Sequence, residues 1–570
     1  MKRAPVVFLS YLLLALIAAL PMAAQADSPR LLAWIPDESA GFVALRYDEQ
    51  TLTALGLSIR TAQLLQPGRI DVGDSLGFDD ILPLDLFDLE QFSFSQQIAP
   101  WLDDEIVFVY RRLNATFSVE ADDFLLMLET RDPLLTLASL EPVIAGQDLL
   151  ERRSYRDIDL YLGDKVAFAV TPSALLIGSE SMIEAAIDTA SGDSERLIDT
   201  PRYRDLAAQA QESAAVSAYF EGEIAARAFS GLLGGGETAA PLLSALGDAL
   251  RAVDERDTLA SALLRGQFDA VAISLLPDLE RLQSMQAVIT AHTDASAPVD
   301  IISAEPRLLD FMPRSAAVVH SGSNATQTAY TMLLSLPLSN YAGTLVGGFP
   351  LRVSDTTSSA NLPPPTADDL GSAFAGLNSA FAVLGESDLE RDLIDHLDGS
   401  YALAVIPRPN APAPLLGTPF DLLLVTEVDD AQAARDGVTR LVETLLGSDI
   451  FVEETLQDQP FSTLRAARTQ TPLLSVGSYE DMLIVGTGQA AQLALDAQRG
   501  DNRLIAQPRW QSVSGDGQPQ LYVDINPYYN LVAPQAGGSQ PLPFNQLGLQ
   551  TRYLGDGLYQ IDLLVTLAAG

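Results

Sequence analysis

Short runs of β-branched and aromatic residues, bounded by turn residues, recur along the chain and predict strands. In the first half of the sequence they cover residues 42–47, 106–111, 124–130, 166–171, 174–179 and 216–221. Only Pro172-Ser173 separates two of these runs, which predicts a tight antiparallel hairpin. The runs 473–478 and 482–487, on either side of Tyr479-Glu480-Asp481, predict a second hairpin of the same kind.

Apolar residues at helical spacing are less frequent, and they predict helices over 133–147, 182–191, 431–446 and 489–498. Consecutive strands with few helices between them are typical of an α+β fold with antiparallel sheet, whereas a doubly wound parallel sheet alternates strands and helices. We therefore predict an α+β protein that is mainly antiparallel sheet with a few packed helices.

Several short segments occur twice along the chain in the same order. The opening PRLLAWIP at 29–36 returns as PRLLDFMP at 306–313. Four further matches follow, at 101–103 and 396–398, 124–132 and 421–429, 174–178 and 482–486, and 196–203 and 503–510. Chance could produce one such match, but hardly the ordered set, and fixed-order repetition indicates a repeated structural unit. The sequence predicts two tandem related units, 29–300 and 306–570, joined near residues 295–306.

The N-terminus has the order of a secretory signal peptide. Lys2 and Arg3 precede an apolar run at 6–20, and Pro21 and Ala24-Gln25-Ala26 follow it. The run is shorter than the about 20 residues that a membrane helix needs. We predict that residues 1–26 are a signal peptide cleaved after Ala26, and that the protein is periplasmic, cell-envelope associated or secreted. Retention of this segment as an anchor is the alternative.

Composition restricts the classes of function. The chain of 570 residues has 34 Lys+Arg against 75 Asp+Glu, a formal net charge of -41, and its hydrophobic content of 48% is ordinary for a folded protein. Nucleic acid is not an expected partner, and an anionic membrane surface is disfavoured, because both require basic surfaces. The sequence has no cysteine, which excludes disulfides, thiol catalysis and iron–sulfur ligation by cysteine.

A family resemblance rests on four segments: PRLLAWIP at 29–36, PWLDDE at 100–105, ALLIGS at 174–179 and AYFE at 218–221. With them the chain resembles the bacterial secreted family of unknown function DUF3352, here as a tandem copy over nearly all of the mature protein. The second copy departs from the pattern, with HLDGS at 396–400 where the first has WLDDE. The resemblance implies an extracytoplasmic setting and a shared fold, and it supplies no assigned activity or catalytic residue.

The segment Gly486-Thr487-Gly488-Gln489-Ala490-Ala491 has the spacing of a dinucleotide-binding turn between a strand and a helix. The matching segment in the first unit, Gly178-Ser179-Glu180-Ser181, has Glu180 where the second glycine should be. Because both copies share a glycine followed by Ser179 or Thr487, we favour a helix-capping role for the two hydroxyls over dinucleotide binding. Ser181 and Glu184 also have the spacing of a capping box.

Three histidines occur, His292, His320 and His396, and neither G-x-S-x-G nor H-E-x-x-H is present. His320 falls in a predicted strand, His292 on the approach to the linker, and His396 where the first unit has Trp101. Without a motif that joins them to a nucleophile or to metal ligands, we expect solvated or packing roles for all three.

Carboxylates are abundant, and most have a structural explanation. Asp132 and Asp429 each precede a predicted helix and are expected to cap it. Glu221 and Asp524 end predicted strands shortly after a tyrosine, but no second carboxylate is placed beside either, as glycosidase-like chemistry would need. A cluster in the segment 71–80 is read as an acidic loop, with calcium binding as the alternative: Asp71, Asp74, Asp79 and Asp80.

These observations assign no catalytic residue, no cofactor and no metal ligand. We predict a non-enzymatic binding or scaffolding module of the cell envelope, with an unknown ligand or envelope component as partner and a ligand region between the two units. An extracytoplasmic hydrolase that uses an Asp/Glu acid–base pair is the alternative. The sequence makes no prediction of the oligomeric state.

Overall fold

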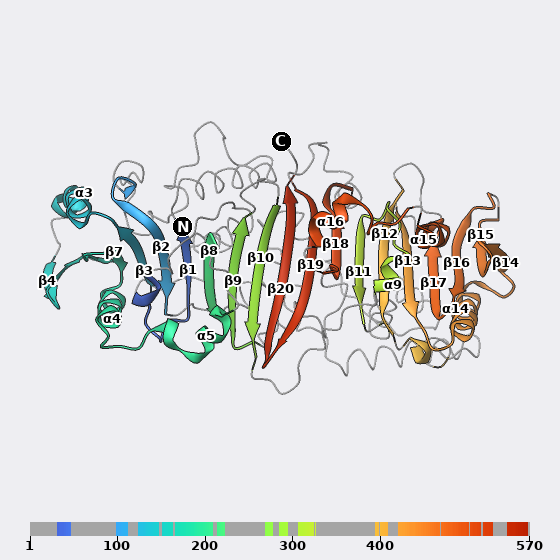
Figure 1. Ribbon diagram of the computed structural model, residues 1–570, viewed down its shortest axis with the longest axis horizontal. Helices are drawn as coiled ribbons and strands as arrows, with labels where there is room; N and C mark the ends of the chain where they lie inside the picture. Colours follow the sequence, from blue (N-terminus) through green and yellow to red (C-terminus); the bar gives the residue numbers. More distant parts are fainter. Residues whose placement is uncertain are drawn as a thin grey trace, which may run out of the picture.

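A computed structural model gives the arrangement of the chain (Figure 1). The residues that it describes are 31–46, 98–111, 124–146, 151–163, 166–208, 214–222, 268–277, 284–293, 306–323, 325, 391, 394–397, 399–408, 420–467, 469–500, 502–514, 517–527 and 544–567. The predicted signal segment 1–26 and the acidic segment 71–80 lie outside them. Within this part of the chain no helix is both long and apolar enough to cross a membrane.

Antiparallel pairing joins the described strands into one continuous sheet of twenty (Figure 1). From one edge to the middle, the strands are β4 (Glu151–Tyr155), β5 (Ile158–Leu162), β6 (Ala167–Val170), β7 (Ala174–Gly178), β3 (Phe124–Thr130), β2 (Leu102–Tyr110), β1 (Gly41–Arg46), β8 (Val216–Glu221), β9 (Ala270–Pro277) and β10 (Ser284–His292).

From the middle to the other edge follow β20 (Leu558–Leu567), β19 (Phe544–Gly555), β18 (Leu521–Asp524), β11 (Val318–Gly322), β12 (Tyr401–Pro407), β13 (Phe420–Glu427), β17 (Met482–Thr487), β16 (Pro472–Tyr479), β15 (Gln459–Arg465) and β14 (Phe451–Leu456). Both predicted hairpins are confirmed, as β6–β7 and β16–β17.

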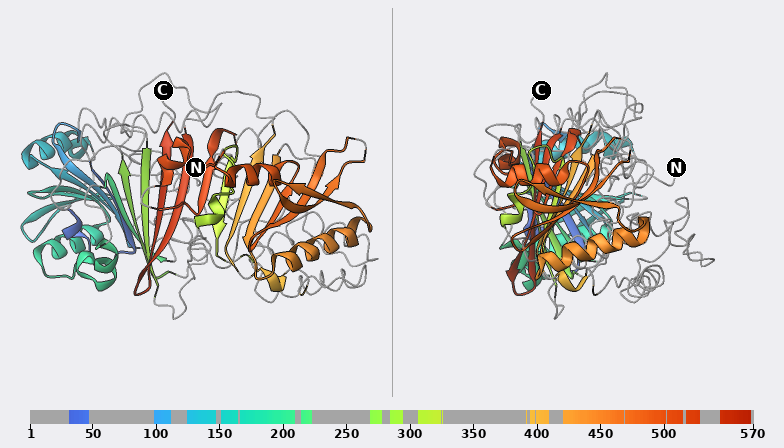
Figure 2. Two further views of the ribbon diagram at one scale, coloured as in Figure 1. Left: turned by 45° about the vertical axis from the view of Figure 1, so that its right-hand side comes forward. Right: turned by 90° about the vertical axis from the view of Figure 1, so that its right-hand side faces the viewer.

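Helices cover the sheet toward both of its ends. In the first half they are η1 (Leu31–Trp34), α3 (Pro133–Gly146), α4 (Glu180–Ser191), η5 (Leu197–Asp199) and α5 (Pro201–Ala207). In the second half they are α9 (Pro306–Leu309), η7 (Ile394–His396), α14 (Ala431–Leu446), α15 (Ala490–Gln498) and α16 (Pro508–Ser514). Helices α14 and α15 pack on opposite faces of the sheet (Figure 2). The predicted α+β class with antiparallel sheet is confirmed, and all four predicted helices are present.

Alternation along the strands builds a core on each face of the sheet. In β3, Leu125 and Met127 pack beneath α4, while Leu126 and Leu128 face the opposite side with Leu140 of α3. Because both faces are covered there, all seven residues of β3 are buried. This explains the continuous apolar run in the sequence, since a strand that is covered on both faces loses its polar positions.

The middle of the sheet is held by a core to which both halves contribute. Val271 and Ile273 of β9 belong to the same buried cluster as Val523 of β18 and Ile561 of β20. The ring of Phe268, which precedes β9, lies edge-on to the ring of Tyr559 in β20, with 5.7 Å between their centroids. The two halves therefore share apolar packing as well as a pair of hydrogen-bonded strands.

The register between β10 and β20 runs from Ser284 opposite Thr566 to His292 opposite Leu558, with Val288 opposite Asp562 at its centre. Asp562 is buried, with 8% of its surface exposed. Its carboxylate accepts hydrogen bonds from the amides of Gln286, at 3.4 Å, and Gln560, at 2.8 Å, and it pairs with Arg552. A buried charge with several partners can fix a register, because a slip would leave it unpaired.

The cap of α3 is confirmed and the predicted cap of α14 is wrong by one residue. The backbone N–H groups of Leu134 and Leu135 donate to Asp132 Oδ1 at 3.1 and 3.0 Å. At α14 the cap is Asp430, whose Oδ1 accepts from the N–H of Ala433 at 3.0 Å. Strand register explains the error. Leu125 of β3 pairs with Gly178, and Leu423 of β13 pairs with Gly486, so Leu125 corresponds to Leu423 in the structure. The match read in the sequence is displaced from this by one residue.

Candidate functional site

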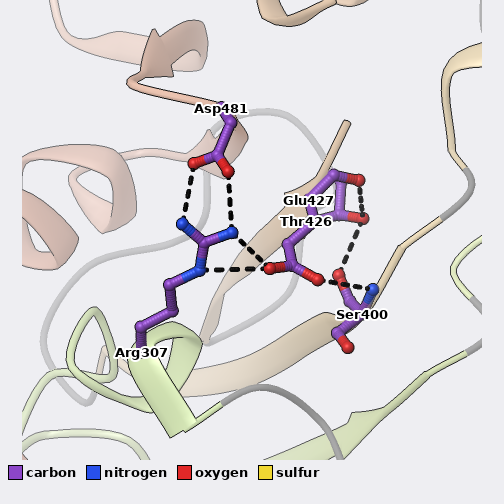
Figure 3. A network of polar contacts seen from close by, with 5 residues as sticks. All are labelled: Arg307, Ser400, Thr426, Glu427 and Asp481. Atoms are coloured by element: carbon purple, nitrogen blue, oxygen red, sulfur yellow. Dashed lines mark hydrogen bonds and ion pairs between the residues drawn. The ribbon is translucent and has the colours of Figure 1, made fainter. Parts of the chain in front are cut away.

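A cluster of polar side chains is centred on Arg307, in the first turn of α9 (Figure 3). Its guanidinium donates to Asp481, in the β16–β17 turn, at 3.0 and 2.7 Å, and to Oε1 of Glu427, at the end of β13, at 3.1 Å through Nε. The other carboxylate oxygen of Glu427 accepts from the backbone N–H of Ser400 at 3.1 Å. Thr426 Oγ1 completes the cluster by donating to the Ser400 carbonyl at 3.2 Å.

Attraction between one guanidinium and two carboxylates holds this cluster together, and we call it the Arg307 clamp. Hydrogen bonding from Arg307 lowers the pKa of Asp481, and the two carboxylates raise the pKa of Arg307 further. Because two carboxylates already engage the guanidinium, it has little capacity left for an anionic ligand. The cluster therefore joins the start of α9 to β13 and to the β16–β17 turn.

Acid should weaken this clamp. The pKa of Asp481 is lower in the folded than in the unfolded state. The stabilisation that its ion pair provides is therefore complete above the unfolded-state pKa, near 3.8, and is lost as the pH falls through the folded-state pKa. We expect Asp481→Asn to reduce stability at pH 7 by about 0.2–1 kcal/mol, the range for exposed ion pairs. The difference from wild type should shrink in thermal melts as the pH is taken further below 3.8. Asp458→Asn, at a carboxylate that is 96% exposed, is the control, and an equal effect there would contradict the assignment.

The glycine-rich segment at α15 does not form a dinucleotide-binding turn. Strand β17 is antiparallel to both of its neighbours, β13 and β16, whereas the dinucleotide fold places this turn in a parallel βαβ unit. The carboxylate of Asp421 lies at the N-terminus of α15, where it accepts from the N–H of Gln489 at 3.3 Å and from Arg408 Nη1 at 3.2 Å. A side chain of the protein thus occupies the position that a phosphate would take.

Gly488 is required at this turn for two reasons. Its φ is +56°, in the left-handed region, and a Cβ atom added there would lie 2.4 Å from Asp421 Oδ1. Burial raises the pKa of Asp421, and the contacts with Gln489 and Arg408 oppose that shift. The glycine motif therefore makes room for an internal carboxylate.

The helix-capping prediction is correct in place for Ser179 alone, and neither hydroxyl makes a capping hydrogen bond. Ser179 stands at the N-cap of α4 but its side chain makes no capping hydrogen bond. Thr487 Oγ1 accepts from the N–H of Leu422 across the sheet at 2.8 Å, and Gln489 is the N-cap of α15. The capping box at Ser181 is wrong as well, because Ser181 lies inside α4 and Glu184 pairs with Arg153 of β4.

The three histidines lie apart from one another. His320, in β11 as predicted, has its Nδ1 2.9 Å from the hydroxyl of Tyr401, and burial lowers its pKa to about 4. His292 is the last residue of β10, and its Nδ1 lies 4.0 Å from Asp269. His396 ends η7. A histidine that stays neutral against a tyrosine hydroxyl fits the packing role expected from the sequence.

Glu221 and Asp524 end β8 and β18, as predicted. Asp524 is buried and pairs with Arg509 of α16, and burial raises its pKa although Arg509 opposes the shift. No group of three or more potential metal-ligating side chains gathers in the part of the chain that could be searched. The predicted loop cluster at Asp71, Asp74, Asp79 and Asp80 lies outside the described residues.

Sequence reasoning missed the main polar contacts of the second half: Arg307, Asp421, Glu427, Asp481 and Arg408. One signal was present, since Arg307 lies in the repeated PRLL segment. Its carboxylate partners, however, come from β13 and from a hairpin turn that only the strand order brings to α9.

The sequence model of one protein family, described as "Protein of unknown function (DUF3352)", matches residues 6–555. No curated protein matches the chain. Among solved structures, crystal form I of TP0453 has 10% identity and a TM-score of 0.25, over 48% of this chain and 82% of that one. Crystal form III of TP0453 has 11% identity and a TM-score of 0.24, over 48% and 82%. At these TM-scores the likeness carries no argument about fold or function.

Proposed function

The chain belongs to the family of proteins of unknown function DUF3352, and we propose that it is a non-enzymatic binding or scaffolding protein of the cell envelope. The observation that carries this proposal is the use made of its polar side chains. Arg307 clamps a helix to the sheet, Asp421 occupies a helix N-terminus, Asp524 pairs with Arg509, and Asp562 joins the two central strands by accepting from Gln286. Each of these groups stabilises an extended sheet, which is a property of a rigid platform.

The two-unit organisation, 29–300 and 306–570, is part of the proposal. Its support is the strand order, because β1–β10 and β11–β20 follow the same succession from edge to centre. In each half the order is the fourth, fifth, sixth, seventh, third, second, first, eighth, ninth and tenth strand. In each half a helix with an aspartate cap also follows the third strand.

The extracytoplasmic setting is proposed from the N-terminal sequence, with cleavage after Ala26. N-terminal sequencing of the protein purified from its host tests this directly. A first residue of Asp27 supports export with cleavage, whereas Met1 on a membrane-bound chain would favour the retained anchor.

Two assays on the purified mature protein test the function. A thermal-shift screen uses calcium, peptidoglycan fragments and zwitterionic lipid vesicles as probes, since a ligand that binds only the folded state raises Tm. A turnover assay covers esters, peptides, phosphates and glycosides. A Tm increase that saturates with one probe, without turnover, supports the proposal. Turnover that is abolished by Asp421→Asn or Asp524→Asn in folded protein would replace it with the hydrolase alternative.

A further inference from the structure

The two outermost strands of the sheet, β4 and β14, lie at opposite ends of the molecule (Figure 1). Among the described residues β4 pairs only with β5, and β14 only with β15. An edge strand presents backbone N–H and C=O groups that can pair with a strand of another chain. Four of the five residues of β4 and three of the six residues of β14 are exposed, and none is buried.

These two edges carry opposite charge. Strand β4 contains Glu151, Arg152 and Arg153, which gives one net positive charge in a strongly acidic chain. Strand β14 contains Glu453 and Glu454 and no basic residue. Like charges that face each other across two strands destabilise the pair, and unlike charges stabilise it. An arginine of β4 set against a glutamate of β14 is therefore a favourable cross-strand pair.

Two charged groups at the edges remain accessible although they have partners within the chain. The side chain of Arg152, paired with Asp159, is 65% exposed, and that of Glu453, paired with Arg435, is 69% exposed. Arg153 is 42% exposed and already engages Glu180 and Glu184 of α4, and Glu454 is 19% exposed and pairs with Arg465. A guanidinium has five N–H donors and a carboxylate about four acceptor sites, so Arg152 and Glu453 can each take a second charged partner.

The side-chain alternation of both strands is compatible with one continuous sheet. Arg153 stands opposite Leu160, in the core beneath α4, and Glu454 stands opposite Phe461, in the core of α15. Both cores lie on the same face of the sheet, which carries η1 and α5 in the first half and α9 and α16 in the second. Arg153 and Glu454 therefore lie on the same face. An antiparallel pairing that places them opposite each other also places Tyr155 opposite Val452.

That second pair gives the contact an apolar component. Val452 is 52% exposed in the single chain. The ring of Tyr155 would cover it in the pairing just described. An aromatic residue opposite a β-branched one is a favourable cross-strand pair.

We propose that copies of this protein associate head to tail, with strand β4 of one copy pairing antiparallel with strand β14 of the next. The contact is heterologous, so it generates an open chain of copies or a ring. The inference goes beyond the proposed function, and it stands whatever the protein binds.

Sedimentation velocity of the full-length mature protein tests this, from about 1 to about 100 μM in low and high salt. We expect assembly that grows with concentration and weakens with salt, because charge pairs at a surface are screened. R152E/R153E and E453R/E454R should each weaken assembly about tenfold or more. Mixing the two variants should restore it, because their reversed edges complement each other. Arg204→Glu, at a side chain that is 63% exposed on α5, is the matched control and should leave assembly unchanged.

A crosslinking measurement does not depend on charge reversal. The chain contains no cysteine, so Tyr155→Cys in one preparation and Val452→Cys in another provide the only thiols. Mild oxidation of an equal mixture should give a disulfide-linked dimer of the two variants well in excess of the twofold ratio to each homodimer that random pairing produces. Wild-type protein that stays monomeric at 100 μM, a failure of the mixed charge variants to assemble, or statistical crosslinking would each overturn the proposal.

Discussion

Tyr559→Ala is expected to destabilise the whole described sheet by about 3–5 kcal/mol, the range for removing a large buried aromatic side chain. Tyr559 is fully buried in β20 and contacts the ring of Phe268 from the other half of the chain. Its loss opens the core that both halves share, so the effect should not be confined to residues near β20.

Chemical denaturation followed by two probes measures this effect. Trp101 lies in the first half and Trp510 in the second, and both are fully or almost fully buried. In single-tryptophan variants of each kind, Tyr559→Ala should lower both denaturation midpoints by the same amount. Val476→Ala, at a buried residue of β16 far from the junction, is the control for ordinary core damage. A shift at only one tryptophan after Tyr559→Ala would mean that the halves unfold independently.

Asp421→Ala should cost about 3 kcal/mol, since removing one partner of a buried ion pair leaves the other charge uncompensated. The Asp421 side chain is only 2% exposed, while that of Arg408 is 22% exposed, so we place the value at the lower end of the usual range. The substitution also removes the acceptor at the N-terminus of α15.

Asp421→Asn separates these two contributions. Asparagine keeps an acceptor for the N–H of Gln489 and loses only the charge, so its destabilisation should be the smaller of the two. Equilibrium unfolding at pH 7 gives both values. Equal effects of the two substitutions would show that the charge carries the whole contribution, and no effect of either would contradict the role given to Asp421.

The fold could be predicted where the local pattern decides it. Helix α14 occupies the predicted residues because polar side chains such as Asp436 and Arg440 mark its outer face. Strand β3 also has its predicted bounds, because a run that is apolar at nearly every position is typical of a strand buried on both faces. In these elements neighbours in the sequence are sufficient evidence.

The candidate site could not be predicted in the same way, since it depends on the order of the strands. Arg307, Glu427 and Asp481 are separated by more than fifty residues from one another and meet only because β13 and β17 are neighbours. The glycines around Thr487 suggested a ligand, and the structure places an internal carboxylate there instead. A spacing motif describes the turn, whereas the group that fills it comes from the tertiary structure.

The centre of the sheet has a consequence for how the two halves can differ. When the two halves are aligned strand by strand through their paired residues, Ala291 of β10 corresponds to Val565 of β20, and Val288 corresponds to Asp562. Under the two-unit proposal, Val288 and Asp562 are thus one ancestral position that meets itself at a two-fold axis. A dimer of identical chains would have to place valine against valine or aspartate against aspartate there. Fusion into one chain removes that restriction, and it permits a single buried carboxylate at the axis.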